Sequence, residues 1–471
     1  MVNYQFTEGT ICAPATIPGT GAISIIRVSG KESLAIADKI IDLKGESLSE
    51  TEGYRLRYGT IFAADGSVLD NVIVSVFRAP HSYTGENSVE ISCHASRFIV
   101  NAILELLVNA GARIAAPGEF TRRAFVNGKM DLAQAEAVAD VIASQSAASH
   151  KVAMNQLKGG FSSELKVLRD KLLKITSLLE LELDFSEEDV EFASRSELGA
   201  LVNEALSHIG RLTDSFSRGN AIKNGVPVAI VGATNTGKST LMNALLGEDR
   251  AIVSDIAGTT RDTIEETLNL GGVMFRFIDT AGIRETDELV EKIGIERTFR
   301  KLNEASIVLG MTDLSRGEDS VLADAEYIWD KVNACGTERE FLLLVNKCDV
   351  DGIESVEAGF AGVGSRAGFA GTGSEAGYAD KTGKMARIEA ALREKGIVTK
   401  MIPISAKTGS GLPELTEALA EIGRRITGDT DETLVTNIRH YEALSRAATA
   451  LGRVRDGLKV ATLPPDLIAQ D

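Results

Sequence analysis

The segment from Gly232 to Ser239 has the residue types and spacing of a phosphate-binding loop. It reads GATNTGKS, fits the pattern G-x-x-x-x-G-K-[S/T], and lies between an apolar run at 226–231 and a segment expected to be helical. Gly237 lets the backbone turn so that successive N–H groups face a phosphate, Lys238 can bridge β- and γ-phosphate oxygens, and Ser239 offers a hydroxyl to Mg²⁺. The predicted nucleotide contacts here are Asn235, Thr236, Gly237, Lys238, Ser239 and Thr240.

Two segments farther along the chain have the residues that a terminal phosphate and its magnesium ion require. DTAG at 279–282 follows an apolar run, as expected of a carboxylate that holds the water shell of Mg²⁺ and a glycine whose N–H meets the γ-phosphate. GTTRD at 258–262 supplies Thr260 as the second Mg²⁺ hydroxyl, in a loop expected to become ordered when the γ-phosphate is present. The predicted contacts are Ser254, Asp255, Ile256, Ala257, Gly258, Thr259, Thr260, Asp279, Thr280, Ala281 and Gly282.

The base is predicted to be guanine, because NKCD at 346–349 follows the apolar run FLLLV. The carboxylate of Asp349 can accept hydrogen bonds from both guanine N1–H and the 2-amino group, donors that adenine cannot present together. A site with such buried paired groups rejects the wrong base by a factor of roughly 10⁴. Ser405 to Lys407 follow another apolar strand and are expected to complete the base pocket. The predicted base contacts are Asn346, Lys347, Asp349, Ser405, Ala406 and Lys407.

Hydrolysis requires a feature other than the usual glutamine. Ile283 follows Gly282 at the position where Ras-type enzymes have a glutamine that orients the attacking water. A cation near the transferred phosphate would supply the charge that an arginine finger usually delivers, and Asn235 could contribute a ligand oxygen to it.

Length and composition bound the class of protein. A chain of 471 residues with 44% hydrophobic residues can form two or three domains. No apolar run approaches the roughly 18 to 20 residues of a membrane helix, the N-terminus lacks a signal-peptide pattern, and the four cysteines have neither metal nor disulfide spacing. We therefore expect a soluble, cytoplasmic protein without a membrane span.

The net charge of -17 disfavours broad attraction to nucleic acid, so an RNA partner would need a local basic patch. Candidates for such a patch are Arg122, Arg123 and Lys129; the alternative is that they are solvated helix charges.

The spacing of apolar residues predicts a multidomain α/β chain. Residues 1–120 mix short apolar runs with turn signals, which indicates an α+β domain. Residues 121–219 and 428–471 have helical spacing, and 220–427 alternate strands with helix-length polar segments, which predicts a mainly parallel sheet covered on both faces. The α/β domain is therefore expected to be inserted into the helical domain. Within it, the glycine-rich repeat AGFAGVGSR and AGFAGTGSE predicts a mobile surface insertion at about 352–384.

Longer segments make the chain resemble the bacterial MnmE (TrmE) family of tRNA modification GTPases over nearly its whole length. The segments are APATIPGTGAISIIRVSG at 13–30, SYTGENSVEI at 82–91, PGEFTRRAFVNGKMDLAQAEAVADVI at 117–142, ELDFSEEDV at 182–190, and DIAGTTRDTIEE and DTAGIRETDELVEKIGIERT around the phosphate motifs. The resemblance implies an N-terminal domain that binds folate and dimerises, a helical domain, and a Ras-like G domain inserted in it.

The resemblance also implies how hydrolysis is completed. Family members use K⁺, which by match would contact Asn235, Ser254, Ile256 and Thr259 and would promote pairing of G domains. Glu291 matches the glutamate that helps to position the attacking water; the alternative is a solvated helix charge.

The implied biological role is addition of an aminomethyl-type group, leading to carboxymethylaminomethyl groups, at C5 of the wobble uridine of certain tRNAs. The implied partners are a second copy of the chain and an FAD-dependent flavoprotein, together in a heterotetramer, and the implied cofactor is 5-formyl-tetrahydrofolate or a related one-carbon folate. Arg27, Glu90 and Lys129 match the folate positions: two cationic groups and an acceptor for the paired donors of a pterin edge.

Two departures and two alternatives accompany this resemblance. Family chains end in Cys-x-Gly-Lys after further helices, whereas this sequence ends in LPPDLIAQD, so the C-terminal part of the helical domain is expected to be truncated. Thr20 and Ala22 replace an arginine and a glycine that are common in the first motif.

A ribosome-assembly or RNA-binding switch GTPase would share the GTTRD loop, but such a protein would have an RNA-binding module, which the sequence does not indicate. A folate enzyme with a regulatory G domain is the other alternative. It would need a catalytic acid or base in the first domain, and the sequence does not clearly indicate one.

Overall fold

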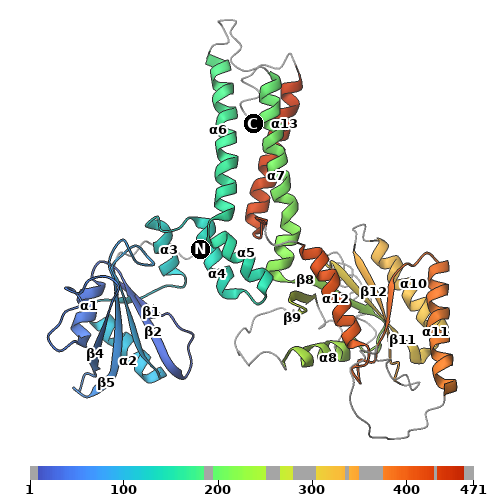
Figure 1. The fold of residues 1–471 in the computed structure, drawn as a ribbon, viewed down its shortest axis with the longest axis horizontal. Helices are drawn as coiled ribbons and strands as arrows, with labels where there is room; N and C mark the ends of the chain where they lie inside the picture. The colour runs from blue at the N-terminus through green and yellow to red at the C-terminus, as the bar shows by residue number, and fades with distance from the viewer. Residues whose placement is uncertain are drawn as a thin grey trace, which may run out of the picture. The chain divides into compact units, whose positions relative to one another are not determined.

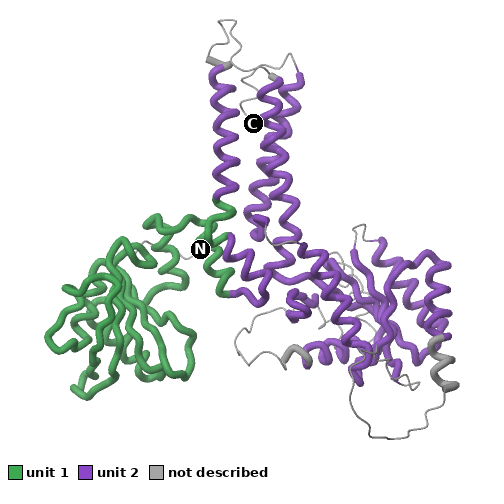
Figure 2. The backbone as a smooth tube through the Cα atoms, viewed as in Figure 1, with its two compact units in different colours: residues 1–142, 156–162 green, residues 143–155, 163–471 purple. Residues whose placement is uncertain are grey.

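The computed structural model describes residues 9–184, 195–250, 266–278, 304–334, 339–349, 375–428 and 432–460. The chain divides into two compact units, and Figure 2 shows them in different colours. The first comprises residues 1–142 and 156–162, and the second comprises residues 143–155 and 163–471. Each unit has a hydrophobic core of its own.

The first unit contains a mixed sheet packed against helices. Within the described residues its seven strands have the order β3-β4-β5-β6-β2-β1-β7, with antiparallel neighbours except for the parallel pair β1 and β7. The elements are β1 (Ile11–Pro14), β2 (Gly21–Ser29), α1 (Ser33–Ile40), β3 (Ile41–Asp42), β4 (Arg55–Phe62), β5 (Val68–Phe77), β6 (Ser88–Ala95), α2 (Arg97–Asn109), β7 (Arg113–Ile114) and α3 (Glu119–Val126).

Buried and exposed side chains alternate along the strands, so one face of this sheet is covered and the other is exposed. On β5, Val72 and Val74 are buried and share a core with Ile103 and Leu107 of α2. Ile73 lies between the two valines in the sequence and is exposed, because successive side chains of a strand point to opposite faces. We call the face away from α1 and α2, which includes Ile73, the outer face.

Long helices form the first part of the second unit and also follow its α/β part (Figure 1). They are most of α5 (Ala147–Leu157) and of α6 (Gly160–Asp184), together with α7 (Arg195–Asn224) and α13 (Ile438–Lys459), whereas α4 (Leu132–Ala143) belongs to the first unit except for its last residue. In the predicted stripe of α6, Leu168, Ile175 and Leu179 are buried, whereas Leu165 is partly exposed. Helix α7 packs against α13, so the helical segments that precede and follow the α/β part in the sequence lie together.

The α/β part of the second unit has the predicted, mainly parallel sheet. Its described strands have the order β13-β12-β11-β8-β10-β9, and only the pair β9 and β10 is antiparallel. The elements are β8 (Val226–Gly232), α8 (Lys238–Arg250), β9 (Glu266–Leu270), β10 (Val273–Ile278), β11 (Ile307–Asp313), η2 (Leu314–Arg316), α10 (Glu318–Ala334), β12 (Glu340–Asn346), α11 (Glu375–Glu394), β13 (Lys400–Pro403) and α12 (Leu412–Thr427).

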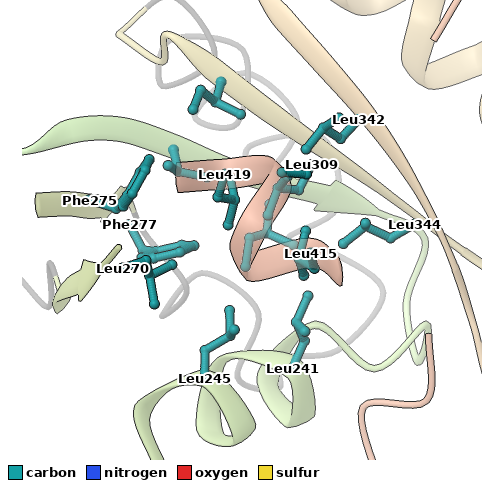
Figure 3. Close-up of a cluster of buried hydrophobic side chains, with 14 of the residues drawn as sticks. Leu241, Leu245, Leu270, Phe275, Phe277, Leu309, Leu342, Leu344, Leu415 and Leu419 are labelled. Carbon is teal, nitrogen blue, oxygen red and sulfur yellow. The ribbon is translucent and has the colours of Figure 1, made fainter. Parts of the chain in front are cut away.

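Helices cover this sheet on both faces. Figure 3 shows the core on one face, where Leu241 and Leu245 of α8 and Leu415 and Leu419 of α12 pack with Phe275 of β10. A second core joins the opposite face to α10 and α11. Because both faces are covered, β11 is buried along its whole length. The predicted fold class, an α+β domain, a helical region and a Ras-like α/β domain, is confirmed.

The predicted glycine-rich insertion ends earlier than expected. Helix α11 begins at Glu375, whereas the sequence pattern extended the insertion to 384. The segment EAGYADKTGKMARIEAALRE contains many good helix formers, and its two glycines are tolerated within a helix of 20 residues. The two glycine-rich repeats lie outside the described residues.

None of the helices within the described ranges is both long and apolar enough to cross a membrane. Those ranges also contain no group of three or more histidine, cysteine, aspartate or glutamate residues arranged to hold a metal ion.

Candidate functional site

The phosphate-binding loop joins the end of β8 to the start of α8. Its backbone takes the left-handed conformation at two positions, with φ of 64° at Asn235 and 99° at Gly237. A β-carbon at Gly237 would come 2.3 Å from Nδ2 of Asn346, so only glycine fits there. Ser239 then lies in the first turn of α8, where backbone N–H groups and the helix dipole favour an anion. The loop therefore has the shape that the motif predicts.

Lys238 folds back onto this loop. Its ammonium donates hydrogen bonds to the carbonyl oxygens of Gly232 (2.8 Å) and Ala233 (2.6 Å). The side chain is buried, and burial lowers the pKa of Lys238 to about 8. A phosphate beside this group would favour its charged form, because an opposite charge opposes the effect of burial. The ammonium is thus held on the loop that would receive the phosphates.

Asn346 connects the phosphate-binding loop with the base-recognition loops. Its side chain is buried, and its Nδ2 donates to the carbonyl oxygen of Thr236 at 2.7 Å. Its Oδ1 accepts a hydrogen bond from the backbone N–H of Ala406 at 3.0 Å. Nearby, the hydroxyl of Ser405 donates to Oδ1 of Asp349 at 2.8 Å. These bonds hold the Asp349 carboxylate, which is predicted to read guanine, in a fixed position relative to the phosphate-binding loop.

The predicted nucleotide-binding residues that the structure describes lie in loops at one edge of the sheet. The loops after β8, β12 and β13 all follow the carboxyl ends of parallel strands, where ligands of open α/β sheets usually bind. Thr240 and Lys407 are exposed beside these loops, and Ser239 is half-buried. The predicted residues that lie outside the described ranges are Ser254, Asp255, Ile256, Ala257, Gly258, Thr259, Thr260, Asp279, Thr280, Ala281, Gly282 and Glu291.

Asp313 and Arg316 belong to this edge but were not predicted. The carboxylate of Asp313 accepts a hydrogen bond from Nζ of Lys347 at 2.6 Å. Arg316 donates to the carbonyl oxygen of Thr234, in the phosphate-binding loop, at 3.1 Å. The carboxylate two residues after the apolar run at 307–311 is a sequence feature that could have indicated Asp313, since it stands near a strand end, as the recognised motifs do.

A second polar site lies on the outer face of the first unit. Arg27 and Glu90 are register partners on β2 and β6, and their side chains form an ion pair with an Nη2 to Oε1 distance of 2.8 Å. The guanidinium of Arg27 lies 5.0 Å from the ring centre of Tyr83 and 5.5 Å from that of Phe120. Two of the three predicted folate residues are therefore in contact, beside two aromatic rings.

Lys129, the third predicted folate residue, contacts the neighbouring loop instead. Its Nζ donates to the carbonyl oxygen of Pro80 at 3.0 Å. The same loop carries Tyr83, whose hydroxyl is 2.8 Å from that of Thr121 on α3. The structure thus places Lys129 at the loop that contacts Arg27, but gives it no described contact with Arg27 or Glu90.

Ion pairs around the buried carboxylate of Glu119 fix helix α3 beside this loop. Glu119 pairs with Arg113 and Arg123, and Arg123 also pairs with Glu86 of the loop. Burial alone would raise the pKa of Glu119, but hydrogen bonds from Arg113, the N–H of Ala116 and Arg123 outweigh it and lower the pKa to about 2. The carboxylate therefore stays ionised at neutral pH. Because Arg123 is already paired with two carboxylates, the structure weakens the case for a basic RNA-binding patch here.

Comparisons with known proteins cover both units. The family model described as GTP-binding protein TrmE N-terminus matches residues 10–129, and the model of the MnmE helical domain matches residues 132–471. The chain belongs to the MnmE family of tRNA modification GTPases. It is 50% identical over 466 residues to the tRNA modification GTPase MnmE of Bacteroides thetaiotaomicron, and 46% identical over 473 residues to that of Porphyromonas gingivalis. These alignments cover 98% and 100% of this chain and 93% of each relative.

Among solved structures, Aquifex aeolicus Era bound to GDP and AlF4- is 24% identical, covers 48% of this chain and 66% of its own, and has a TM-score of 0.29. A likeness this low adds nothing to the argument from the strands and loops. The predicted family and the prediction of a GTPase are confirmed by the family models and relatives. The roles of individual site residues remain predictions, supported by where the structure places them.

We expect Gly237→Ala to weaken GDP binding by roughly tenfold to a hundredfold, because a strained left-handed residue and a displaced Asn346 side chain disturb the loop. The measurement is isothermal titration calorimetry with GDP. Gly247→Ala in α8 is the matched control, since a β-carbon there meets nothing within 4 Å. An unchanged Kd for Gly237→Ala would show that the loop does not bind the nucleotide as described.

Proposed function

We propose that the chain binds GTP at the edge of the sheet formed by the loops after β8, β12 and β13, hydrolyses it, and uses hydrolysis in the modification of tRNA. The observation that carries the nucleotide part is the hydrogen-bonded assembly around Asn346. One buried amide joins the loop shaped for phosphates to the loops that hold Asp349 and Ser405. This assembly supports recognition of both ends of one guanine nucleotide.

The residues have distinct parts in the proposed reaction. Lys238 would hold the β- and γ-phosphate oxygens, and the N–H groups of the phosphate-binding loop would stabilise negative charge on them. Ser239 and Thr260 would hold Mg²⁺, which neutralises charge on the phosphates when bound. The half-buried hydroxyl at the first turn of α8 is a suitable ligand, because Mg²⁺ prefers oxygen donors. Asp349 would accept the paired donors of guanine.

The proposed catalytic cation is K⁺, held by Asn235, Ser254, Ile256 and Thr259. Two features support it: Ile283 replaces the usual glutamine, and Asn235 is an exposed residue of the phosphate-binding loop with a left-handed backbone. Glu291 would position the attacking water. Apart from Asn235, these residues lie outside the described ranges, so their proposed roles rest on the match to the family.

We expect GTP hydrolysis to be roughly 10² to 10³ times faster in KCl than in NaCl at the same ionic strength, because the ion stabilises charge in the transition state. Single-turnover hydrolysis with Mg²⁺ present in both salts measures the effect. Rates that agree in the two salts would contradict the proposed cation, while leaving GTP hydrolysis itself intact.

The proposed biological reaction is modification of the wobble uridine of tRNA at C5. The named relatives are tRNA modification GTPases and are aligned over 93% of their length, which supports the same role here. We infer a flavoprotein partner in a heterotetramer, a cytoplasmic location, and a reduced folate bound near Arg27 and Glu90. The ion pair beside Tyr83 and Phe120 suits a folate, since it offers a carboxylate, a guanidinium and aromatic rings together.

Deletion of the gene is expected to remove the C5-modified wobble uridines from tRNA, as measured by chromatography and mass spectrometry of tRNA nucleosides. A plasmid copy should restore them, and a copy with Gly237→Ala should not. Normal nucleosides together with accumulated ribosomal precursor particles would instead favour a ribosome-assembly GTPase.

The outer face of the first unit supports the proposed homodimer. Leu56 and Tyr58 on β4 are 64% and 62% exposed, and Ile73 on β5 is 49% exposed. Tyr58 and Ile73 are register partners, so their side chains lie next to each other on the sheet. Neighbouring apolar side chains of this size on a sheet face are typical of a surface that another protein covers. We infer that a second copy of the chain covers them.

Tyr58→Arg is expected to weaken the dimer by at least roughly tenfold, because it places an unpaired charge in the apolar contact. Sedimentation velocity over a range of protein concentrations measures the dissociation. Phe98→Arg is the control, since Phe98 is 73% exposed but lies on α2, which covers the other face. A Tyr58→Arg protein that dimerises like the wild type would exclude this face as the interface.

A further inference from the structure

Asp313 is a buried carboxylate at the nucleotide-binding edge to which neither the sequence motifs nor the proposed reaction assigns a role. It is the last residue of β11, its exposure is 2%, and its register partner on the neighbouring strand is Asn346. Its Oδ2 accepts from Nζ of Lys347 at 2.6 Å, and its Oδ1 accepts from the N–H and the hydroxyl of Ser315 at 3.0 Å and 2.6 Å. Both carboxylate oxygens are therefore used.

The same short segment reaches the phosphate-binding loop. Asp313 caps the 3-10 turn η2, which ends at Arg316, and the guanidinium of Arg316 donates to the carbonyl oxygen of Thr234 at 3.1 Å. Nε of Arg316 lies 3.8 Å from Oδ2 of Asp313. The carboxylate thus has a lysine of the base-recognition loop on one side and an arginine that contacts the phosphate-binding loop on the other.

The charge on Asp313 is retained in the fold. Burial alone would raise the pKa of this carboxyl, but the hydrogen bonds from Lys347 and Ser315 outweigh burial and lower it. Lys347 is fixed in turn, with a left-handed backbone (φ of 65°) and an ammonium held by a charge-assisted bond. A lysine side chain otherwise has many conformations, and a ligand that needs one of them must order it on binding.

We propose that Asp313 is a positioning residue for guanine nucleotides, which orders Lys347 before the nucleotide binds. This inference rests on the proposed function, since it concerns the same site. Asp313 acts through Lys347, which belongs to the base-recognition loop, and the base is the same in GDP and in GTP. Its contribution is therefore the same for GDP, for GTP and for the transition state. An interaction of that kind changes Kd and KM while kcat stays the same.

The test is Asp313→Asn, which keeps the shape of the side chain and an acceptor for Ser315 but removes the charge that holds Lys347. We expect Kd for GDP and for a slowly hydrolysed GTP analogue to rise by the same factor, roughly tenfold to a hundredfold, as for the loss of a hydrogen bond to a charged group. The kcat for GTP at saturation should stay within about twofold of the wild type. Calorimetry and steady-state kinetics on the full chain measure these quantities.

A double-mutant cycle with Lys347→Met identifies the route of the effect. If Asp313 acts through Lys347, the double variant Asp313→Asn with Lys347→Met binds GDP no more weakly than Lys347→Met alone. Additive losses would overturn the inference. Asp319→Asn makes the same charge change at an exposed position in the first turn of α10, and it should leave Kd and kcat unchanged.

A further variant keeps the inference testable if Asp313→Asn does not fold, as judged by circular dichroism and thermal unfolding. Ser315→Ala removes the hydroxyl that fixes Oδ1 of Asp313 from an exposed position, and Kd for GDP should rise about twofold to tenfold. An unchanged Kd for the folded variant, or a fall in kcat that exceeds the rise in Kd, would overturn the inference. A wild-type chain that neither binds GDP nor hydrolyses GTP would refute the proposed function instead.

Discussion

The nucleotide-binding edge depends on one buried amide, the side chain of Asn346. It donates to the backbone of the phosphate-binding loop and accepts from the backbone of the loop after β13. Leaving either end of a buried amide unpaired would cost roughly 1–3 kcal/mol, so neither loop can move away alone without a penalty. Both of its partners are main-chain groups. The two hydrogen bonds therefore require a particular backbone path and do not depend on which side chains lie nearby. The distance between the phosphate and base regions is thereby set by the fold.

Parallel pairing explains why these loops can meet at all. Strands β8, β11 and β12 lie side by side in register, so their carboxyl ends form one continuous edge. The backbones approach so closely that a β-carbon at Gly232 would come 2.3 Å from the carbonyl oxygen of Met311. Because β11 lies between β8 and β12, its last residue, Asp313, is next to both loops. A carboxylate at that strand end can therefore contact Lys347 directly and influence Thr234 through Arg316.

Sequence motifs predicted the parts of this edge whose residue types are dictated by the ligand. Gly237, Lys238 and Asn346 were predicted because phosphate and guanine recognition require those types at those spacings. Asp313 was missed because its role follows from strand register: Lys347 is 34 residues away in the sequence and becomes a neighbour only when β11 pairs with β12. Periodicity likewise predicted the stripe of α6 but not that Leu165 is partly exposed, since which turns of a long helix are covered depends on its neighbours. Lys129 was assigned by match to the family, and its contact with Pro80 could not be read from residue type.

The two proposed properties of the first unit are joined by the geometry of its outer face. Arg27 pairs in register with Glu90, Glu90 with Ser75, and Ser75 with Leu56, so one row of side chains crosses four strands. The row begins with a charged pair and ends among exposed apolar residues that include Tyr58. A partner that covered the whole row, the charged end included, would lower the dielectric constant around Arg27 and Glu90, which strengthens their attraction but also raises the cost of separating the two charges. A folate that binds there would contact the carboxylate and the guanidinium while they stay paired, because the ion pair leaves both groups partly exposed. The charged end, which is proposed to bind folate, and the apolar end, which is proposed to pair with a second copy, therefore lie on one face of the sheet and within one row of side chains.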